Sequence, residues 1–294
     1  MKWVLTDLSY LAHRARHAFK GLEFEDAKTG VTFGFFESLR TICFDPRIQS
    51  NKVALFFDSR QSYRRRLFPD YKRSRMDRTP EEMAELIIMH EQISRLKNEI
   101  LPDVGFPLFK QIGLESDDLL ASAAKFVAGG VLVTADNDLF QCITDTVHWF
   151  DPQRDLYLTP TTFLELKGVT PFQWKAVKAI CGCHGDGVPG IGGVGEKGAI
   201  DFLTGKMPQT SKKFLKITSP ETAPILARNG ELTSLPHPKT GPIHLTPPTY
   251  HPERFFKWAK KLGFESMLEK NRNSWERFFE GKMIVGPVPR RRGE

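Results

Sequence analysis

Three short apolar runs, rich in β-branched and aromatic residues, each lead to an aspartate. They span residues 3–6 before Asp7, residues 53–57 before Asp58, and residues 131–134 before Asp136. Short runs that are apolar throughout are typical of strands buried on both faces, as in parallel sheets. Residues 34–43 and 117–127, between these runs, repeat apolar positions with a helical period. The pattern predicts an α/β fold with a mostly parallel sheet flanked by helices.

The rest of the chain follows other patterns. Residues 60–78 carry eight Lys or Arg and lead into a charged helical stretch over residues 80–99, which predicts a long excursion from the sheet. After about residue 159 the pattern is helical, apart from the glycine-rich residues 185–198. Weak periodicity over residues 204–252 predicts long loops, whereas residues 252–281 are typical of amphipathic helices. We expect residues 287–294 to form a frayed basic tail.

Charge and cysteine content indicate the cellular compartment and the kind of partner to expect. The 294 residues include 42 Lys and Arg against 35 Asp and Glu, so a polyanionic partner is compatible with the formal charge of +7. Asp7 interrupts the first apolar run, which excludes a secretory signal, and no segment approaches the ~18 apolar residues of a membrane span. The four cysteines lack the regular spacing of a disulfide framework. We therefore expect a cytoplasmic chain with no membrane partner.

Acidic side chains gather where the predicted strands end, which is the edge at which such sheets collect ligands. Three more carboxylates start the helix predicted over residues 117–127. Taken singly, these acids are more typical of turns and of helix capping. Taken together, in a basic protein, they indicate hard oxygen ligands for Mg²⁺ or Mn²⁺, with two ions clamping the oxygens of a phosphoryl displacement. The seven acids are Asp7, Asp58, Glu115, Asp117, Asp118, Asp136 and Asp138.

A glycine-rich string over residues 187–199 is the second strong signal. Its glycines free backbone N–H groups to approach a phosphate, and a helix predicted to start near Glu196 points its positive end the same way. A tight turn between two helices is the alternative interpretation. The Pro-Gly-Ile-Gly-Gly-Val-Gly-Glu-Lys order favours a grip on a duplex backbone that reads no bases.

These motifs resemble those of structure-specific 5′ nucleases, the family that includes the 5′ nuclease domain of bacterial DNA polymerase I, phage 5′ exonucleases and flap endonucleases. The resemblance covers roughly residues 1–203. It implies a PIN-like nuclease core over residues 1–165, with a helical arch at about 60–110. It also implies a helical DNA-binding region over residues 166–294, with a helix-two-turn-helix at about 172–204. The matching motifs, in order, are residues 7–19, 57–58, 71–75, 115–118 and 136–138 and the glycine string.

The resemblance also implies roles for single residues. Asp7, Asp58, Glu115 and Asp117 would hold a first metal ion, with Asp118, Asp136, Asp138 and Asp186 around a second. Lys72 and Arg75 resemble the catalytic basic residues that contact the scissile phosphate, although a solvated helix face is the alternative. Tyr71 resembles an aromatic on which a frayed base stacks, and ordinary packing is its alternative. Arg14 and His17 fit a phosphate path or simple packing. Gly190, Gly193, Gly195 and Lys197 would contact DNA, with K⁺ bound at the hairpin carbonyls.

One position departs from the family pattern. Bacterial relatives carry an aspartate where this chain has Cys183, which places occupancy of the second metal site in question. Cys181, Cys183 and His184 also raise a soft-metal alternative, but no second cluster with zinc spacing accompanies them, and a reduced cysteine pair is favoured.

The implied function is a metal-dependent 5′-3′ exonuclease and flap endonuclease that acts in replication-primer removal or repair. Its partners would be DNA with a 5′ flap, nick, gap or free 5′ end, and RNA–DNA primer junctions, bound by a monomer in the cytoplasm, or in the host cytoplasm for a phage-encoded chain. No polymerase domain is expected to follow. A DNA-junction binding protein whose catalysis has lapsed is the leading alternative, and an RNA-directed nuclease is disfavoured by the hairpin.

Overall fold

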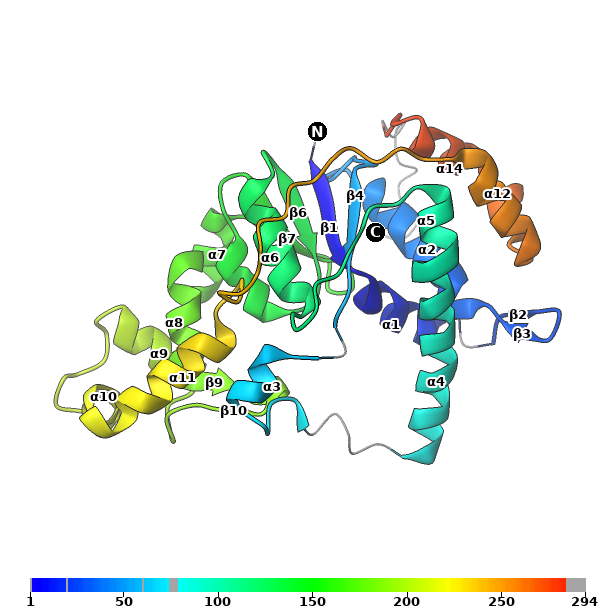
Figure 1. Ribbon diagram of the computed structural model, residues 1–294. Helices are drawn as coiled ribbons and strands as arrows, with labels where there is room; N and C mark the ends of the chain where they lie inside the picture. The colour runs from blue at the N-terminus through cyan, green and yellow to red at the C-terminus, as the bar shows by residue number, and fades with distance from the viewer. Residues whose placement is uncertain (1, 20, 60, 74–78, 284–294) are drawn as a thin grey trace, which may run out of the picture.

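A six-stranded sheet forms the centre of the computed structural model, which describes residues 2–19, 21–59, 61–73 and 79–283 (Figure 1). All neighbouring strands pair in parallel except the last two, which are antiparallel. The predicted α/β class is confirmed, and the three predicted strands are β1, β4 and β6. The strand order is β5 (Leu108–Phe109), β4 (Val53–Phe56), β1 (Trp3–Asp7), β6 (Gly130–Val133), β7 (Val147–Asp151) and β8 (Leu156–Leu158).

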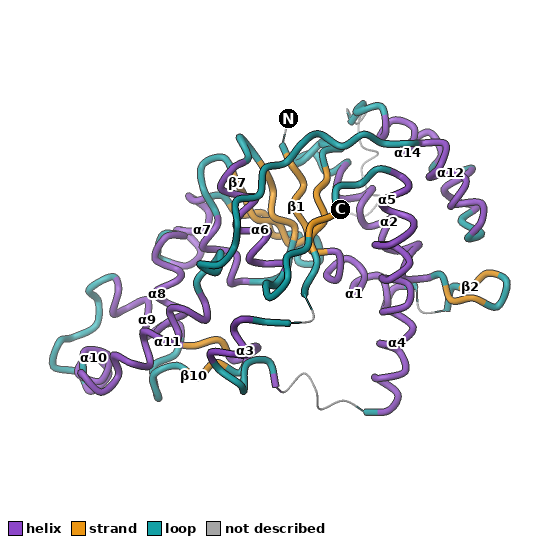
Figure 2. The backbone as a smooth tube through the Cα atoms, viewed as in Figure 1, coloured by secondary structure: helices purple, strands orange, loops and turns teal. Residues whose placement is uncertain are grey.

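Helices cover both faces of this sheet (Figure 2). Successive side chains of a strand point to opposite faces, so Val4 and Leu5 enter different hydrophobic cores. The core containing Val4 includes residues of α1 (Leu8–Ala18), α2 (Gly30–Cys43) and α4 (Pro80–Arg95). The core containing Leu5 includes residues of α6 (Ser116–Phe126) and α8 (Pro171–Cys181). Burial on both sides explains why the strand sequences are apolar throughout.

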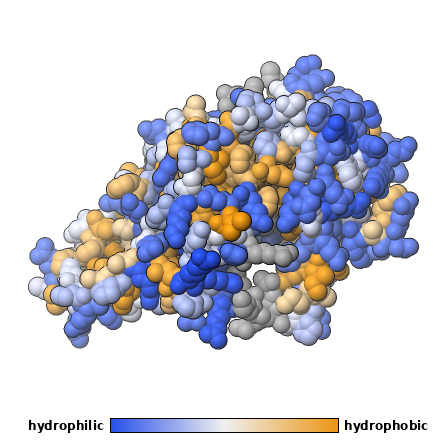
Figure 3. Space-filling view, in the orientation of Figure 1, coloured by the Kyte–Doolittle hydropathy of each residue, from blue (hydrophilic) through white to orange (hydrophobic). Residues whose placement is uncertain are grey.

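The predicted excursion leaves the sheet after β4 and returns at β5. It contains α3 (Tyr63–Leu67), α4, the π-helical turn η2 (Leu96–Ile100) and α5 (Leu101–Val104). Thr79 and Glu82 form a reciprocal capping box at the start of α4, with Pro80 in its first turn. Met83, Ile87 and Ile88 are exposed, and Figure 3 shows apolar surface over the lower part of α4. Residues 60 and 74–78 of the predicted arch lie outside the described residues.

Short helices and a hairpin follow the sheet. They are α7 (Pro160–Lys167), α8, β9 (Gly182–Cys183), η4 (His184–Asp186), β10 (Val188–Pro189) and α9 (Glu196–Leu203). The predicted boundary at residue 165 falls inside α7, and Trp174 of α8 packs in the same core as Leu132 of β6. The helical region therefore shares a core with the sheet. The helix–hairpin–helix over residues 171–203 matches the predicted motif region.

The prediction of long loops over residues 204–252 is wrong for its first half. This segment contains α10 (Lys212–Thr218), η5 (Pro220–Thr222) and α11 (Ala223–Thr233). The helices are specified by caps and distant contacts that periodicity does not reveal. Ser211 accepts a hydrogen bond from Phe214 N, and the buried Asn229 amide donates to the carbonyls of Ala179 and Pro189.

Residues 234–251 lack regular secondary structure and run across the molecule to α12 (Pro252–Lys261), α13 (Glu265–Leu268) and α14 (Arg272–Phe279) (Figure 1). These helices confirm the predicted pattern of residues 252–281. A small hairpin of β2 (Glu23–Phe24) and β3 (Ala27–Lys28) separates α1 from α2. The expected basic tail, residues 287–294, lies outside the described part. Among the described residues, no helix is both long and apolar enough to cross a membrane.

Candidate active site

The N-terminus of α6 holds the carboxylates of Asp7 and Asp58. Asp7 is the last residue of β1, and Asp58 lies two residues beyond β4, its parallel neighbour. The Ser116 hydroxyl donates to Asp7 at 2.8 Å, and the Ser116 backbone N–H donates to Asp58 at 2.8 Å. Ser9 N donates to the other Asp7 oxygen at 2.7 Å. The N-terminus of α6 thus fixes both carboxylates at the sheet edge where they were expected.

Asp117 and Asp136 add two further carboxylates close to Asp7 and Asp58. Asp117 lies in the first turn of α6, and Asp136 caps η3 (Asn137–Cys142) by accepting from Asp138 N at 2.7 Å. Burial and the charge of Asp58 raise the pKa of Asp7 to about 7. Burial raises the pKa of Asp117, and the charges of Asp136, Asp7 and Asp58 raise it further. Crowded carboxylates with raised pKa values indicate that positive charge would stabilise the cluster.

Glu115 takes part in a different arrangement. Its Oε2 accepts from Lys72 Nζ at 2.7 Å and from the Tyr71 hydroxyl at 2.9 Å. Burial opposes ionisation of Glu115, but the charge and hydrogen bond of Lys72 together with Arg64 lower its pKa. Lys72 Nζ also lies 3.8 Å from Asp186, and Tyr71 donates to Asp186 at 3.2 Å. Lys72 and Tyr71 therefore join Glu115 to the hairpin carboxylate.

The structure bears on the predicted role of Tyr71 and on the alternative interpretation of Lys72. Tyr71 is only 3% exposed, so its ring is part of a small core with Val188 and Leu232 and offers no surface for a base to stack on. Lys72 lies in a turn with φ of +56°, not on a solvated helix face, and its backbone N–H donates to Asp186 O at 2.8 Å. Arg75 lies outside the described residues.

Asp118 is fully buried and already paired. Both of its oxygens accept from Arg64, at 2.5 and 2.8 Å, and Oδ1 also accepts from His237 N at 2.8 Å. Arg64 in turn donates to Leu232 O at 2.7 Å. A bidentate ion pair with added backbone bonds saturates this carboxylate and ties α3 and α6 to the segment after α11. The geometry therefore speaks against the expected metal-ligand role of Asp118.

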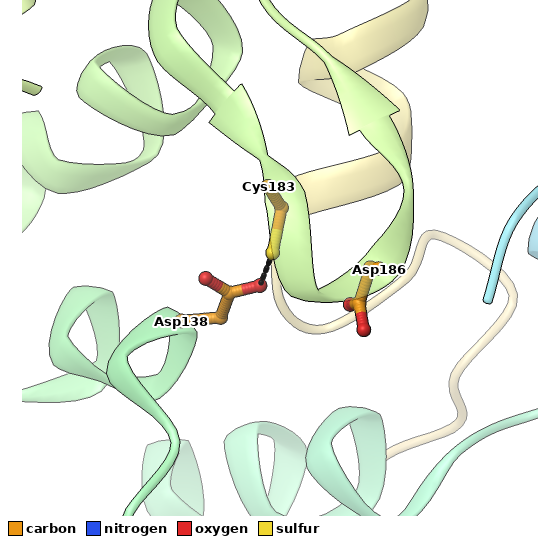
Figure 4. A group of neighbouring side chains, drawn as sticks. All are labelled: Asp138, Cys183 and Asp186. Atoms are coloured by element: carbon orange, nitrogen blue, oxygen red, sulfur yellow. Dashed lines mark hydrogen bonds between the residues drawn. The ribbon is translucent and has the colours of Figure 1, made fainter. Parts of the chain in front are cut away.

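Asp138, Cys183 and Asp186 form a compact group, with one donor atom of each within 4.8 Å of the others. Figure 4 shows Asp138 and Cys183 pointing toward each other from η3 and β9, with Asp186 at the turn that follows. The Cys183 thiol donates to Asp138 at 3.6 Å, and burial together with the charge of Asp138 raises its pKa to about 12. Lys178 Nζ lies 2.7 Å from the other Asp138 oxygen and 3.8 Å from Cys183 Sγ.

The glycine loop is open to solvent beside this group. Residues 187–195 line a cavity of about 450 Å³ together with Cys181 and His184. Gly190 is required by close approach, because a Cβ there would lie 2.2 Å from the carbonyl carbon of Cys181. Gly193 has a φ of +83° and, like Gly195, has nothing within 4 Å of an added Cβ. Lys197 is exposed in the first turn of α9.

Comparison with known proteins decides the family. A family model described as the 5′-3′ exonuclease N-terminal resolvase-like domain matches residues 2–168, more than half of the chain. The chain belongs to this 5′-3′ exonuclease family.

Relatives of the family differ in length. Thermostable DNA polymerase I of Thermus aquaticus is 32% identical over 206 residues, which cover 68% of this chain but only 23% of the polymerase. The chain thus matches about a quarter of that relative. The 5′-3′ exonuclease of Buchnera aphidicola is 26% identical over 244 residues and covers 81% of this chain and 82% of its own length. The fold resembles that of the bacteriophage T5 flap endonuclease, solved with DNA and metal ions, with a TM-score of 0.67, 19–20% identity and 95% of this chain covered.

Three residues of this candidate site escaped the motif analysis. Ser116 holds Asp7 and Asp58, Arg64 neutralises Asp118, and Lys178 neutralises Asp138. Three acids in one helical turn indicate that a positive charge lies nearby, but the sequence does not identify Arg64 as the residue that carries it. Arg14 lies on α1 with its guanidinium 6.0 Å from the centre of the Tyr10 ring, and its place on a phosphate path stays a prediction. The side chain of His17 lies outside the described part.

Proposed function

We propose that the chain is a divalent-metal-dependent 5′ nuclease, acting as a 5′-3′ exonuclease and flap endonuclease on DNA. Its family membership supports a hydrolase of phosphodiester bonds. Two relatives carry the names 5′-3′ exonuclease and flap endonuclease, and the latter was solved with DNA and metal ions. The wider role that we propose is primer removal or repair in the cytoplasm, by a monomer.

The observation that carries this proposal is the group Asp7, Asp58, Asp117 and Asp136. Among the residues that the structure describes, no ion pair joins any of the four to a Lys or Arg. Their side chains offer only carboxylate oxygens, the ligands that Mg²⁺ and Mn²⁺ prefer. Burial and neighbouring carboxylates raise the pKa values of Asp7 and Asp117, and a bound cation would lower them. The donor set therefore suits a divalent cation in kind, while the group of described residues whose ligand atoms already lie within 4.8 Å of one another is Asp138, Cys183 and Asp186.

A bound divalent cation supplies a lowered pKa for water and positive charge for the phosphate oxygens. The chain's own residues set the geometry. Ser116 and Ser9 hold the Asp7 carboxylate in one orientation, and Ser116 N holds Asp58. Among the hydrogen bonds of the described residues, the Ser116 hydroxyl is the one hydroxyl that bonds a carboxylate of this group. Because this bond orients Asp7, we assign no protein nucleophile.

Lys72 is proposed to meet the scissile phosphate. Its ammonium is largely buried between Glu115 and Asp186, and this pairing raises its pKa despite the opposing effect of burial. The group therefore stays protonated at any physiological pH. A phosphate arriving beside the acids would find a positioned donor there, and Arg75 remains a prediction for the same role.

The glycine loop is proposed to hold the duplex. The space around Gly193 and Gly195 and the exposed Lys197 side chain support contacts to phosphates. The close approach of Gly190 to the Cys181 backbone leaves no room for a side chain in this part of the loop. We also propose that K⁺ binds carbonyl oxygens of this loop. The Gly192 carbonyl already attracts one cation, since Lys216 Nζ donates to it at 2.7 Å.

A cleavage map tests this function. The wild-type chain would be incubated with 5′-labelled flapped, nicked, gapped and blunt DNA, an RNA–DNA primer junction and single-stranded RNA, in Mg²⁺, Mn²⁺ or EDTA. Metal-dependent products from flapped or 5′-ended DNA support the proposal. Tight junction binding without product in either metal would instead support the junction-binding alternative. Products from single-stranded RNA alone would support an RNA-directed nuclease.

A further inference from the structure

Six carboxylates of the site divide into two sets according to whether a lysine lies beside them. Asp7, Asp58, Asp117 and Asp136 include acids held by backbone N–H and serine partners. Asp138 and Asp186 have lysines: Lys178 lies 2.7 Å from Asp138, and Lys72 lies 3.8 Å from Asp186. The second set is the one that forms a compact group with Cys183 (Figure 4).

We propose that the Lys178 ammonium takes the place of a second metal ion at the Asp138–Cys183–Asp186 group, so that the chain binds one divalent ion tightly. This inference rests on the proposed function, because it concerns how many ions the same site holds. It revises the expectation of two ions.

Position supports the proposal. Lys178 lies on α8, five residues before Cys183, and its Nζ reaches Asp138 Oδ1 at 2.7 Å and Cys183 Sγ at 3.8 Å. Both the Lys178 and the Asp138 side chains are largely shielded, at 13% and 12% exposure. The ammonium therefore lies beside both of the side chains that an ion shared by Asp138 and Cys183 would need. An arriving ion would displace it, and a lysine released beside a dication would be repelled at close range.

Ligand chemistry supports it as well. Two carboxylates and one thiol offer fewer hard oxygen donors than three carboxylates would, and Mg²⁺ binds oxygen in preference to sulfur. With a neutral thiol at Cys183, Asp138 is the carboxylate that forms a direct ion pair with Lys178, so one negative charge meets one positive charge. An aspartate at position 183 would add a second negative charge that one lysine could not balance.

Mn²⁺ binding to the full chain without DNA tests the inference, measured by the loss of the free-ion electron paramagnetic resonance signal and by titration calorimetry. We expect one tight ion per wild-type chain. The double variant Cys183→Asp with Lys178→Met should bind a second ion tightly. Lys175→Met, on the same helix with its ammonium over the exposed Phe172 ring, is the control and should stay at one.

The outcomes separate the inference from the function beneath it. Two tight ions in the wild-type chain would overturn the inference while leaving the nuclease proposal intact. A folded double variant that still binds one ion would overturn it too, with the fold checked by circular dichroism. No tight ion in the wild-type chain would overturn the inference, while metal-dependent cleavage of flapped DNA would still support the nuclease proposal.

Discussion

The Ser116 hydroxyl donates a hydrogen bond of 2.8 Å to Asp7 across 109 positions of sequence. Ser116→Ala removes this bond but keeps the backbone N–H that Asp58 accepts. Removing a residue that orients a metal ligand typically lowers metal affinity or activity by about 10- to 100-fold. We expect a reduction in that range in apparent Mg²⁺ affinity during flap cleavage, with DNA affinity unchanged. Ser122→Ala, buried on the same helix but bonded to Gly241 O, should leave Mg²⁺ affinity as it was.

Asp118 should matter for stability and not for metal binding. Asp118→Ala would strand the buried Arg64 guanidinium, and breaking a buried pair in this way costs about 3 to 5 kcal/mol. Urea unfolding measures that change. Removing Glu276 from its exposed pair with Arg272 should cost less than about 1 kcal/mol. Asp118→Asn should keep the Mn²⁺ stoichiometry, and a folded Asp118→Asn chain that binds one ion fewer would restore the ligand role.

Mg²⁺ should stabilise the chain more as pH rises. Without a cation, burial and Asp58 raise the pKa of Asp7 to about 7, above its value in the unfolded chain. The contribution of such an acid to the free energy of unfolding is complete below about pH 4, where the acid is protonated in both states. This contribution is lost as pH rises through about 7. Mg²⁺ binds the ionised form, so the increase in Tm on its addition should be larger at about pH 8 than at about pH 5.5. Asp7→Asn should shrink this difference, and equal increases at both pH values in the wild-type chain would contradict the prediction.

Lys197 should affect DNA affinity without affecting chemistry. Its ammonium is exposed beside the open glycine loop. For duplex DNA, each phosphate that a protein cation neutralises adds about 0.9 to the steepness with which binding weakens as salt rises. Lys197→Ala should therefore weaken flap binding and reduce that steepness by about 0.9, while the maximal cleavage rate at saturating DNA stays the same. Lys257→Ala, exposed on α12, is the control. A salt dependence of Lys197→Ala equal to that of the wild-type chain would refute the proposed phosphate interaction.

Short sequence patterns predicted the strands of this site and the acids that follow them. Apolar runs buried on both faces identify β1, β4 and β6, and parallel pairing brings the acids that follow them to one edge. The partners of those acids depend on distant contacts that no local pattern contains. Arg64 reaches Asp118 across 54 positions, and Asn229 anchors α11 to carbonyls 40 and 50 positions away. Burial of the Tyr71 ring, which disfavours the predicted stacking role, also depends on distant residues, Val188 of the hairpin and Leu232 of α11.

Single-turnover cleavage of a labelled 5′-flap duplex across a range of Mg²⁺ concentrations tests the central claim. This claim is that Asp7, Asp58, Asp117 and Asp136 hold the metal ion for catalysis. The wild-type chain should form product in proportion to Mg²⁺ occupancy. Asp58→Asn should lower the rate by more than the roughly 10- to 100-fold typical of residues that only orient a metal ligand, while still binding the flap. Asp26→Asn, in the exposed turn between β2 and β3, should behave as wild type. Cleavage by Asp58→Asn at the wild-type rate and with the wild-type Mg²⁺ dependence would contradict the account.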